Sequence, residues 1–145
     1  TRLKPIIYSP AYNRVDGAII EVDENDVKSE IVGVGIPKGV REAQLDMLVQ
    51  KSGRTTCHVI DGTITGVDAT IGPISYGPGK SAYFTDQIII SKEGFSAGGD
   101  SGSLVLDMDG YAVGKLFAGS AEENITIANP IQIYLDLLDA ELITE

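Results

Sequence analysis

Residues 96–105, SAGGDSGSLV, place one serine in a glycine turn that leads directly into an apolar run. Gly99 and Gly102 flank the pair Asp100 and Ser101, and glycine permits sharp backbone turns that residues with a Cβ atom resist. The apolar run 104–106 is typical of a buried strand. The stretch therefore predicts either a nucleophilic serine exposed at the end of a strand or a solvated serine in a hairpin.

The chain as a whole is typical of an all-β domain. Its 145 residues fit one domain, and hydrophobic residues make up 43% and charged residues 22% of them, as in folded globular proteins. The 17 glycines indicate many tight turns between short apolar segments, which predicts a barrel or a sandwich. Residues 23–27 (DENDV) and 107–110 (DMDG) are expected hairpin tips. The expected strands cover residues 3–8, 17–22, 30–34, 48–51, 55–60, 63–65, 83–91, 103–106, 111–117 and 124–128.

One helix is expected at the end of the chain. Asn129 is a suitable N-cap, and Pro130 fits the first helical position, where its missing N–H is not needed. Apolar side chains then recur at helical spacing and predict a face that packs on the strands. These side chains are Ile131, Tyr134, Leu135, Leu138 and Leu142.

Charge and composition exclude several classes of partner. The formal net charge of −10 argues against nucleic acid or an anionic membrane, because phosphate binding requires clustered Lys and Arg. No apolar run approaches the roughly 20 residues that span a bilayer, and no metal or cofactor motif is present. Residues 75–81 (SYGPGKS) fail as a phosphate-binding loop because Ile74 stands where the first glycine is required. The single cysteine, Cys57, excludes an intramolecular disulfide.

Four segments together resemble the chymotrypsin-like serine peptidases, in particular a bacterial branch of them. Residues 98–105 (GGDSGSLV) resemble the segment that carries the nucleophile, and residues 14–20 (RVDGAII) resemble the segment that carries the triad aspartate. Residues 51–65 (KSGRTTCHVIDGTIT) are similar to a segment of the bacterial branch. Residues 113–120 (VGKLFAGS) resemble the strand that lines the substrate groove. The resemblance covers nearly the whole chain, and GDSG is its most specific part.

This resemblance implies a fold and a set of catalytic roles. Residues 26–145 are expected to form the second, six-stranded antiparallel barrel of such a peptidase with its C-terminal helix, and residues 1–25 a remnant of the first barrel. Ser101 would be the nucleophile, and Asp16 would orient a catalytic histidine. The glycines allow the amides of Gly99 and Ser101 to point into one concavity, where they would stabilise an oxyanion.

The catalytic histidine of these peptidases has no counterpart upstream of Asp16. The only histidine, His58, follows Asp16, and it cannot pair with the adjacent Cys57 on a strand, because neighbouring side chains point to opposite faces. We therefore expect the C-terminal part of a serine endopeptidase, inactive alone, whose histidine comes from a missing N-terminal part. Expected partners are a peptide or protein substrate and that N-terminal part or a second copy. The alternatives are a non-catalytic protein-binding module and a product of self-cleavage.

Substrate preference is implied only by position relative to the nucleophile. In the family, the residue six places before the nucleophile often forms the base of the specificity pocket; here it is Phe95, followed by Ser96. Leu116 stands where the resemblance would place a glutamate-selecting histidine. An apolar or small preference follows from these side chains. The remaining residues expected to line the groove are Phe117, Ala118 and Gly119.

Overall fold

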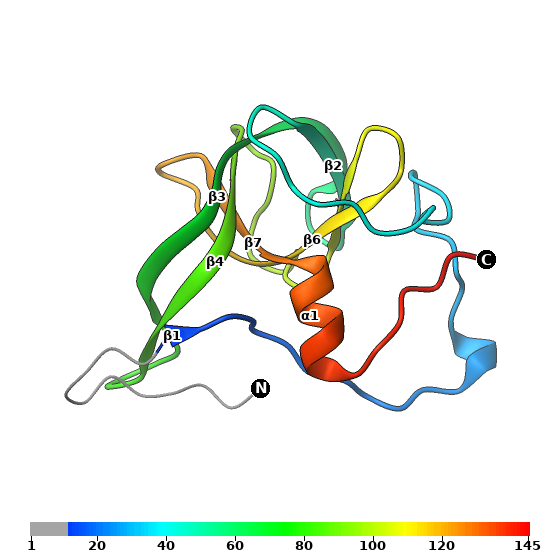
Figure 1. Ribbon diagram of the computed structural model, residues 1–145, viewed down its shortest axis with the longest axis horizontal. Coiled ribbons are helices and arrows are strands. Elements are labelled where there is room, and N and C mark those ends of the chain that lie inside the picture. Colours follow the sequence, from blue (N-terminus) through cyan, green and yellow to red (C-terminus); the bar gives the residue numbers. More distant parts are fainter. Residues whose placement is uncertain (1–11) are drawn as a thin grey trace.

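The computed structural model describes residues 12–145, and its centre is a closed ring of six antiparallel strands (Figure 1). The ring runs β4–β3–β2–β5–β6–β7, and β7 pairs back onto β4. The prediction of an all-β fold with six antiparallel strands and a C-terminal helix is confirmed. The strands are β2 (Leu48–Gly53), β3 (Cys57–Ser75), β4 (Ser81–Ser91), β5 (Leu104–Asp107), β6 (Ala112–Ser120) and β7 (Ile125–Pro130).

Alternation of apolar and polar residues explains how these strands fill the ring. In β4, Ala82, Phe84, Ile88 and Ile90 are buried together with the polar Gln87, and the other side chains of the strand are more exposed. Burial of apolar area drives this arrangement. The main core is a single cluster of buried side chains that come from all around the ring: Val49, Ile64, Ile88, Ile90, Phe95, Val105, Val113, Leu116 and Ala128.

The long strand β3 joins two strands that the sequence predicted separately. Residues 55–60 and 63–65 were expected as two strands, whereas β3 runs without interruption from Cys57 to Ser75. Its pairing with β4 shifts register four times, and such bulges bend a strand. The bends let one strand of 19 residues follow the curvature of the ring.

Two expected strands before the ring are not formed. Residues 17–22 have no strand partner, and Ile19 and Ile20 are 64% and 79% exposed. Residues 30–34 form a tight turn instead, closed by the bridge between Ile31 and Gly35. Both predictions were wrong because apolar alternation forms a strand only where a neighbouring strand is available. The expected strand 3–8 lies outside the described residues.

Of the two expected hairpin tips, one is confirmed. Residues 107–110 turn between β5 and β6, where Asp107 accepts hydrogen bonds from the amides of Asp109 and Tyr111. Residues 23–27 are not a hairpin tip: they contain the short 3-10 helix η1 (Glu24–Asp26), whose N-cap is Asp23. The Asp23 side chain accepts from the Asn25 amide and so closes the turn locally.

The C-terminal helix α1 (Ile131–Leu138) packs on β6 and β7, as Figure 1 shows. Pro130, and not Asn129, occupies the N-cap position, because the Asn129 side chain is bonded to other parts of the molecule. The helix ends at Leu138, so the expected stripe stops before Leu142. Ile131 is the buried residue of the helix.

Candidate active site

Ser101 lies at the tip of the loop between β4 and β5. It is exposed, and its hydroxyl donates a long hydrogen bond of 3.4 Å to the Phe117 carbonyl. Gly99 and Gly102 adopt φ angles of 101° and 97°, which residues with a side chain rarely adopt. The Gly102 amide bonds to the Leu116 carbonyl at 2.8 Å. The glycines thus turn the chain so that the loop returns to β6, and Ser101 remains exposed to solvent.

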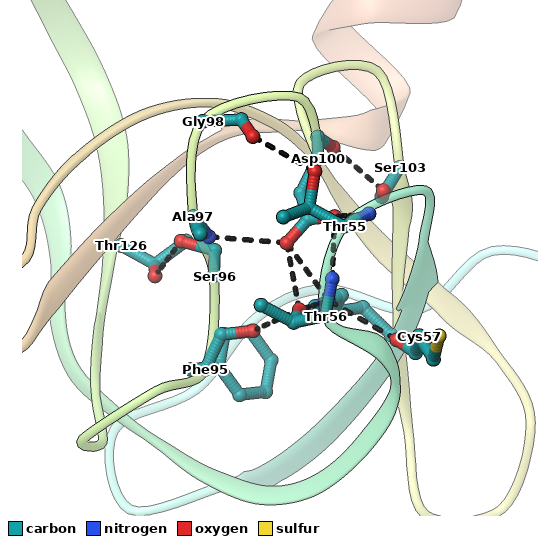
Figure 2. A network of polar contacts seen from close by, with 11 residues as sticks. Thr55, Thr56, Cys57, Phe95, Ser96, Ala97, Gly98, Asp100, Ser103 and Thr126 are labelled. Carbon is teal, nitrogen blue, oxygen red and sulfur yellow. Dashed lines mark hydrogen bonds and ion pairs between the residues drawn. The ribbon is translucent and has the colours of Figure 1, made fainter.

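Asp100, directly before Ser101, is fully buried and holds the loop in place (Figure 2). Its Oδ1 accepts from the amides of Thr55 (2.7 Å) and Thr56 (3.2 Å). Its Oδ2 accepts from the Ala97 amide (3.0 Å) and the Thr56 hydroxyl (2.7 Å). Burial by itself raises the pKa of Asp100, but the hydrogen bonds from Thr56 and from three amides outweigh it and hold the pKa well below its usual value. Asp100 is therefore a buried carboxylate that ties its loop to the β2–β3 turn.

Lys51 supplies the positive charge next to this carboxylate. Its side chain is fully buried in β2, and its Nζ lies 3.2 Å from Asp100 Oδ2. The same ammonium donates to the Thr56 hydroxyl and, at 3.1 Å, to the Cys57 carbonyl. A buried charge requires such a partner, since an unpaired ion in the interior is strongly unfavourable.

Close backbone contacts complete the junction between the loop and the β2–β3 turn. A Cβ atom on Gly53 would lie 2.5 Å from Asp100 Oδ1, and one on Gly99 would lie 2.4 Å from Thr55 Oγ1. The Thr55 hydroxyl also donates to the Gly98 carbonyl at 2.8 Å, as Figure 2 shows. Only glycine fits at both positions, so the segments 53–56 and 98–100 fit each other as a unit.

The amides of Gly99 and Ser101 were predicted to form an oxyanion site. Within residues 12–145, neither amide donates a hydrogen bond to a protein acceptor. Free N–H groups beside an exposed serine are what an oxyanion site requires. Their convergence on one point stays a prediction.

A pair of buried amide side chains holds the backbone of the segment that carries Asp16. Gln87 and Asn129 are both fully buried, and Asn129 Nδ2 donates to Gln87 Oε1 at 2.7 Å. Gln87 donates to the Arg14 carbonyl (2.8 Å), and Asn129 Oδ1 accepts from the Asp16 amide (3.1 Å). Val15 between them is fully buried. Just before them, β1 (Tyr12–Asn13) runs parallel to β4.

The Asp16 carboxylate lies at the surface of the ring and is bonded by a tyrosine, whereas a lysine bonds the Asp16 backbone. Tyr76, from the β3–β4 hairpin, donates its hydroxyl to Asp16 Oδ2 at 2.5 Å, and Lys115 Nζ donates to the Asp16 carbonyl at 2.8 Å. Burial, and then the hydrogen bond to Asp16, raise the pKa of Tyr76 above its usual value. Burial lowers the pKa of Lys115, while the negative charge of Asp16 opposes this. No hydrogen bond in the described chain joins Asp16 to Ser101.

The only histidine of the sequence is bonded to a glutamine. His58 Nε2 is 2.9 Å from Gln50 Oε1, and its ring packs against Gly33. In the part of the chain that the structure describes, it forms no hydrogen bond with Ser101 or Asp16. Cys57 is exposed, and its carbonyl rather than its thiol contacts the buried lysine.

Three of the predicted substrate-binding residues have buried side chains. Phe95 and Leu116 are 1% and 2% exposed and belong to the core cluster. Phe117 is 8% exposed, and its ring lies 4.8 Å from that of Phe84. Contact between these side chains and a substrate stays a prediction.

The other three lie nearer the surface. Ser96 is partly buried, and its hydroxyl lies 2.5 Å from that of Thr126 in β7. Ala118 is half-buried and Gly119 is exposed, both in β6. Thr126 was not singled out from the sequence, since a threonine in an apolar strand carries no functional signal by itself.

Sequence reasoning also missed the residues that support Asp100 and Asp16. Lys51, Thr55 and Thr56 lie in segment 51–65, which was assigned no role beyond its resemblance to the bacterial branch. A lysine in an expected strand was the available signal that Lys51 has a buried partner. Tyr76 and Lys115 gave no such signal, because their role depends on contacts across the fold.

The described residues contain neither a cluster of metal ligands nor a membrane-spanning helix. No group of three or more His, Cys, Asp or Glu residues that could hold a metal ion occurs in residues 12–145. No helix in the same part of the chain has the length and apolar character to span a membrane.

Comparison with solved structures identifies the fold. The chain is similar to the chymotrypsin of Cellulomonas bogoriensis (TM-score 0.63, 24% identity, 77% of this chain and 57% of that one). It is also similar to protease A of Thermobifida fusca (TM-score 0.63, 26% identity, 76% and 55%). A third similar structure is a glutamic acid specific serine protease described as using a histidine triad in substrate binding (TM-score 0.57, 25% identity, 70% and 50%). No family model matches the chain, and no curated protein matches it.

These matches show that the chain has the fold of bacterial chymotrypsin-like serine proteases. The predicted resemblance to that group is confirmed. The chain spans about half the length of the solved proteins that it matches.

Proposed function

We propose that this chain carries the nucleophile of a serine endopeptidase. The observation that carries the proposal is the Ser101 loop: an exposed serine with two free amides, those of Gly99 and of Ser101 itself, on a turn fixed by the buried Asp100 carboxylate. Such a loop is costly to build for a serine that is merely solvated, because it buries an ion pair. The fold shared with bacterial serine proteases supports the same function.

In this proposal Ser101 Oγ attacks the carbonyl carbon of the scissile peptide bond. The amides of Gly99 and Ser101 stabilise the resulting oxyanion, an effect worth about 3 kcal/mol per donor. A histidine accepts the serine proton and passes it to the leaving amine, and water then hydrolyses the acyl-enzyme. Asp16 orients that histidine. Tyr76 bonds one oxygen of Asp16, which leaves the other for an imidazole N–H.

The histidine is supplied from outside these 145 residues. His58 is the only histidine of the sequence and is bonded to Gln50 instead. Another segment of the same protein or a second chain would bring the base beside Asp16, and residues 1–25 would belong with that part. An unactivated serine is a poor nucleophile, so the 145-residue chain alone is nearly inert.

The substrate in this proposal is a peptide or protein bound along β6. The hydroxyls of Ser96 and Thr126 and the exposed backbone at Gly119 border the region next to Ser101's loop. None of the residues predicted to line the substrate site is charged, which favours a small or apolar residue over a charged one before the cleaved bond.

Labelling with a serine-directed fluorophosphonate tests the proposal. The 145-residue chain should label slowly or not at all, and a chain extended upstream to include a histidine-bearing segment should label quickly. Ser101→Ala should abolish labelling, and His58→Ala, the matched control at the other candidate residue, should leave it unchanged. An extended, folded chain that never labels at Ser101 contradicts the proposal. If the short chain labels quickly and His58→Ala removes this labelling, the base is His58.

A non-catalytic peptide-binding module is the second candidate. It is favoured by the contacts of Asp16 and His58, which bond to Tyr76 and Gln50 and not to Ser101. A module of this kind would bind peptides along β6 with an affinity that Ser101→Ala leaves unchanged, and it would release them uncleaved even in the extended chain.

A further inference from the structure

A cavity of about 400 Å³ lies beside the first turn of α1. This volume falls within the range of small-ligand pockets, roughly 300–1,000 Å³. The cavity is bordered by β3, β4, β6, the start of α1 and the loop before β2. None of the residues proposed for catalysis or substrate binding lines it, so it is independent of the Ser101 loop.

The loop wall of the cavity is fixed in place by Arg41. The Arg41 amide bonds to the Ala112 carbonyl at 2.8 Å. Its guanidinium contacts the carboxylates of Asp107 (2.5 Å) and Asp109 (2.9 Å) and stacks 4.0 Å above the Tyr111 ring. The loop is therefore tied to the β5–β6 hairpin by charge, hydrogen bond and stacking. A wall held this way forms a cavity before any ligand arrives.

The floor of the cavity is apolar. Ile88, Val113 and Ile131 line it and are 2%, 1% and 3% exposed. Val67 adds a partly buried aliphatic side chain from β3. An aliphatic group that enters would bury apolar area against this floor, which is favourable in water.

The mouth of the cavity carries excess negative charge. Glu42 and Asp68 are exposed, and neither forms a salt bridge within residues 12–145. Asp86 pairs only with Arg14, through side chains that are 34% and 50% exposed. The one cation on the lining, Arg41, is already shared by two carboxylates.

Bulges on adjacent strands direct two of these carboxylates to the cavity. Asp68 in β3 and Asp86 in β4 have φ angles of 50° and 65°, and both flank the shifted pairing of Ala69 with Gln87. A bulge re-aims a side chain relative to regular strand pairing. The cavity thus combines a fixed wall, an apolar floor and an acidic mouth.

We propose that this cavity is a docking site for a segment of a protein partner in which one Lys or Arg is flanked by aliphatic residues. The aliphatic side chains cover Ile88, Val113 and Ile131. The cation sits at the mouth with Asp68 and competes with Arg14 for Asp86. Charge complementarity selects this occupant, because an acidic or neutral peptide would leave the unpaired carboxylates without a counter-ion.

Binding of a small peptide to the 145-residue chain tests the docking site. The probe is acetyl-Leu-Lys-Leu-amide, followed by amide chemical shifts in a ¹⁵N-labelled sample. We expect saturable shifts that cluster at Val67, Ile88, Val113 and Ile131. Acetyl-Leu-Glu-Leu-amide should cause none, and acetyl-Gly-Lys-Gly-amide should bind more weakly, because it lacks the aliphatic groups.

A charge-matched pair of variants separates the cavity from general attraction. The double variant Asp68→Asn/Asp86→Asn should lower the affinity for the probe peptide about fivefold, as expected for the loss of two exposed ion pairs. It should fold, because asparagine also tolerates positive φ. The control Glu24→Gln/Asp26→Asn removes the same charge from the exposed helix η1 and should leave the affinity unchanged.

Any of the following results would overturn the proposal. They are the absence of saturable binding, equal binding of the glutamate peptide, equal weakening by the two double variants, and binding that requires removal of residues 1–11. The last would make the chain's own basic segment the occupant. If the chain self-associates and the probe peptide disrupts this self-association, the occupant of the cavity would be a second copy of the chain and not a protein partner.

Discussion

The loop that carries Ser101 and the segment that carries Asp16 are held in opposite ways. Beneath Ser101, the Asp100 carboxylate is fully buried and is bonded by side chains and amides from two other segments. At Asp16 it is the backbone that is held by buried groups, and the carboxylate lies at the surface against Tyr76. Residues 18–30 then continue without strand partners (Figure 1).

This difference indicates which part of the candidate site the ring builds by itself. The turn at Ser101 is determined by contacts between β2, the β2–β3 turn and the β4–β5 loop, all within the ring. The Asp16 carboxylate has one tyrosine partner, and the apolar residues that follow it are exposed. Under the proposed function, the ring completes the nucleophile and a partner completes the acid–base pair.

The largest expected effect is at Lys51. Lys51→Met leaves the Asp100 carboxylate buried without its counter-ion, and loss of one partner of a buried ion pair destabilises by about 3–5 kcal/mol. Urea unfolding followed by circular dichroism measures this loss. Lys80→Met, in the exposed β3–β4 turn, is the control and should change the free energy of unfolding by less than about 0.5 kcal/mol.

A second variant keeps this test valid if Lys51→Met fails to fold. Lys51→Met/Asp100→Asn removes both charges and should recover part of the lost stability, because no unpaired ion remains. A loss below about 1 kcal/mol for Lys51→Met, or a double variant less stable than the single one, would show that the pair does not hold the loop.

A smaller effect is expected at the amide pair that holds Asp16. Asn129→Ala leaves the Asp16 amide and Gln87 Oε1 without partners, and each unsatisfied buried group costs about 1–3 kcal/mol. We expect a loss of about 2 kcal/mol, with faster hydrogen exchange at Asp16 and unchanged exchange at Thr55. Gln132→Ala removes an exposed amide of α1 and serves as the control. Faster exchange at Thr55 as well would mean that the two regions are not independent.

The sequence predicted the regular part of the fold and not its supports. Alternation and turn residues located five strands of the ring and the first part of β3, because each pairs with a neighbour inside the same domain. The same alternation misled at residues 17–22, where no neighbour is present. Local pattern reports which face a side chain prefers and carries no information on whether a partner strand exists.

Prediction of the candidate site shows the same limit. GDSG marked the turn at Ser101, since the glycines and the serine are adjacent in sequence. Lys51 lies 49 residues before Asp100, and Tyr76 lies 60 residues after Asp16. Such pairs arise from register and strand curvature, so single-residue propensities do not contain them. Asn129 was predicted as a helix cap because its local position fits, whereas its buried contacts with Gln87 and Asp16 prevail.

A pH dependence sharpens the comparison at the Asp16 side. Because the pKa of Tyr76 is raised in the folded chain, the unfolded chain ionises first as the pH rises above about 10. The stability that the protonated Tyr76 hydroxyl contributes is therefore fully present below that pH and declines above it. In urea titrations between pH 9 and 11, Tyr76→Phe should lose stability less steeply than the parent chain.

Asp16→Asn provides the companion measurement for Tyr76. It removes the negative charge that helps to raise the Tyr76 pKa but leaves burial, the larger cause, in place. Its profile should therefore fall between those of the parent chain and Tyr76→Phe. A profile of Tyr76→Phe that coincides with the parent would show that the Tyr76–Asp16 contact does not form in solution.

The smallest effect is expected where the Asp16 segment leaves the ring. Ile20 is 79% exposed and has no strand partner, so Ile20→Ser should change the free energy of unfolding of the 145-residue chain by less than about 0.5 kcal/mol. Val15→Ser, five residues earlier, is the contrast. Because Val15 is fully buried, this variant should lose about 2 kcal/mol of the free energy of unfolding. In a chain extended by its histidine-bearing part, Ile20 would be covered, and the same Ile20→Ser should then destabilise by about 1–2 kcal/mol. Equal, negligible losses in the short and the extended chain would mean that no partner covers this segment, and the proposed completion of the site beside Asp16 would lose its structural basis.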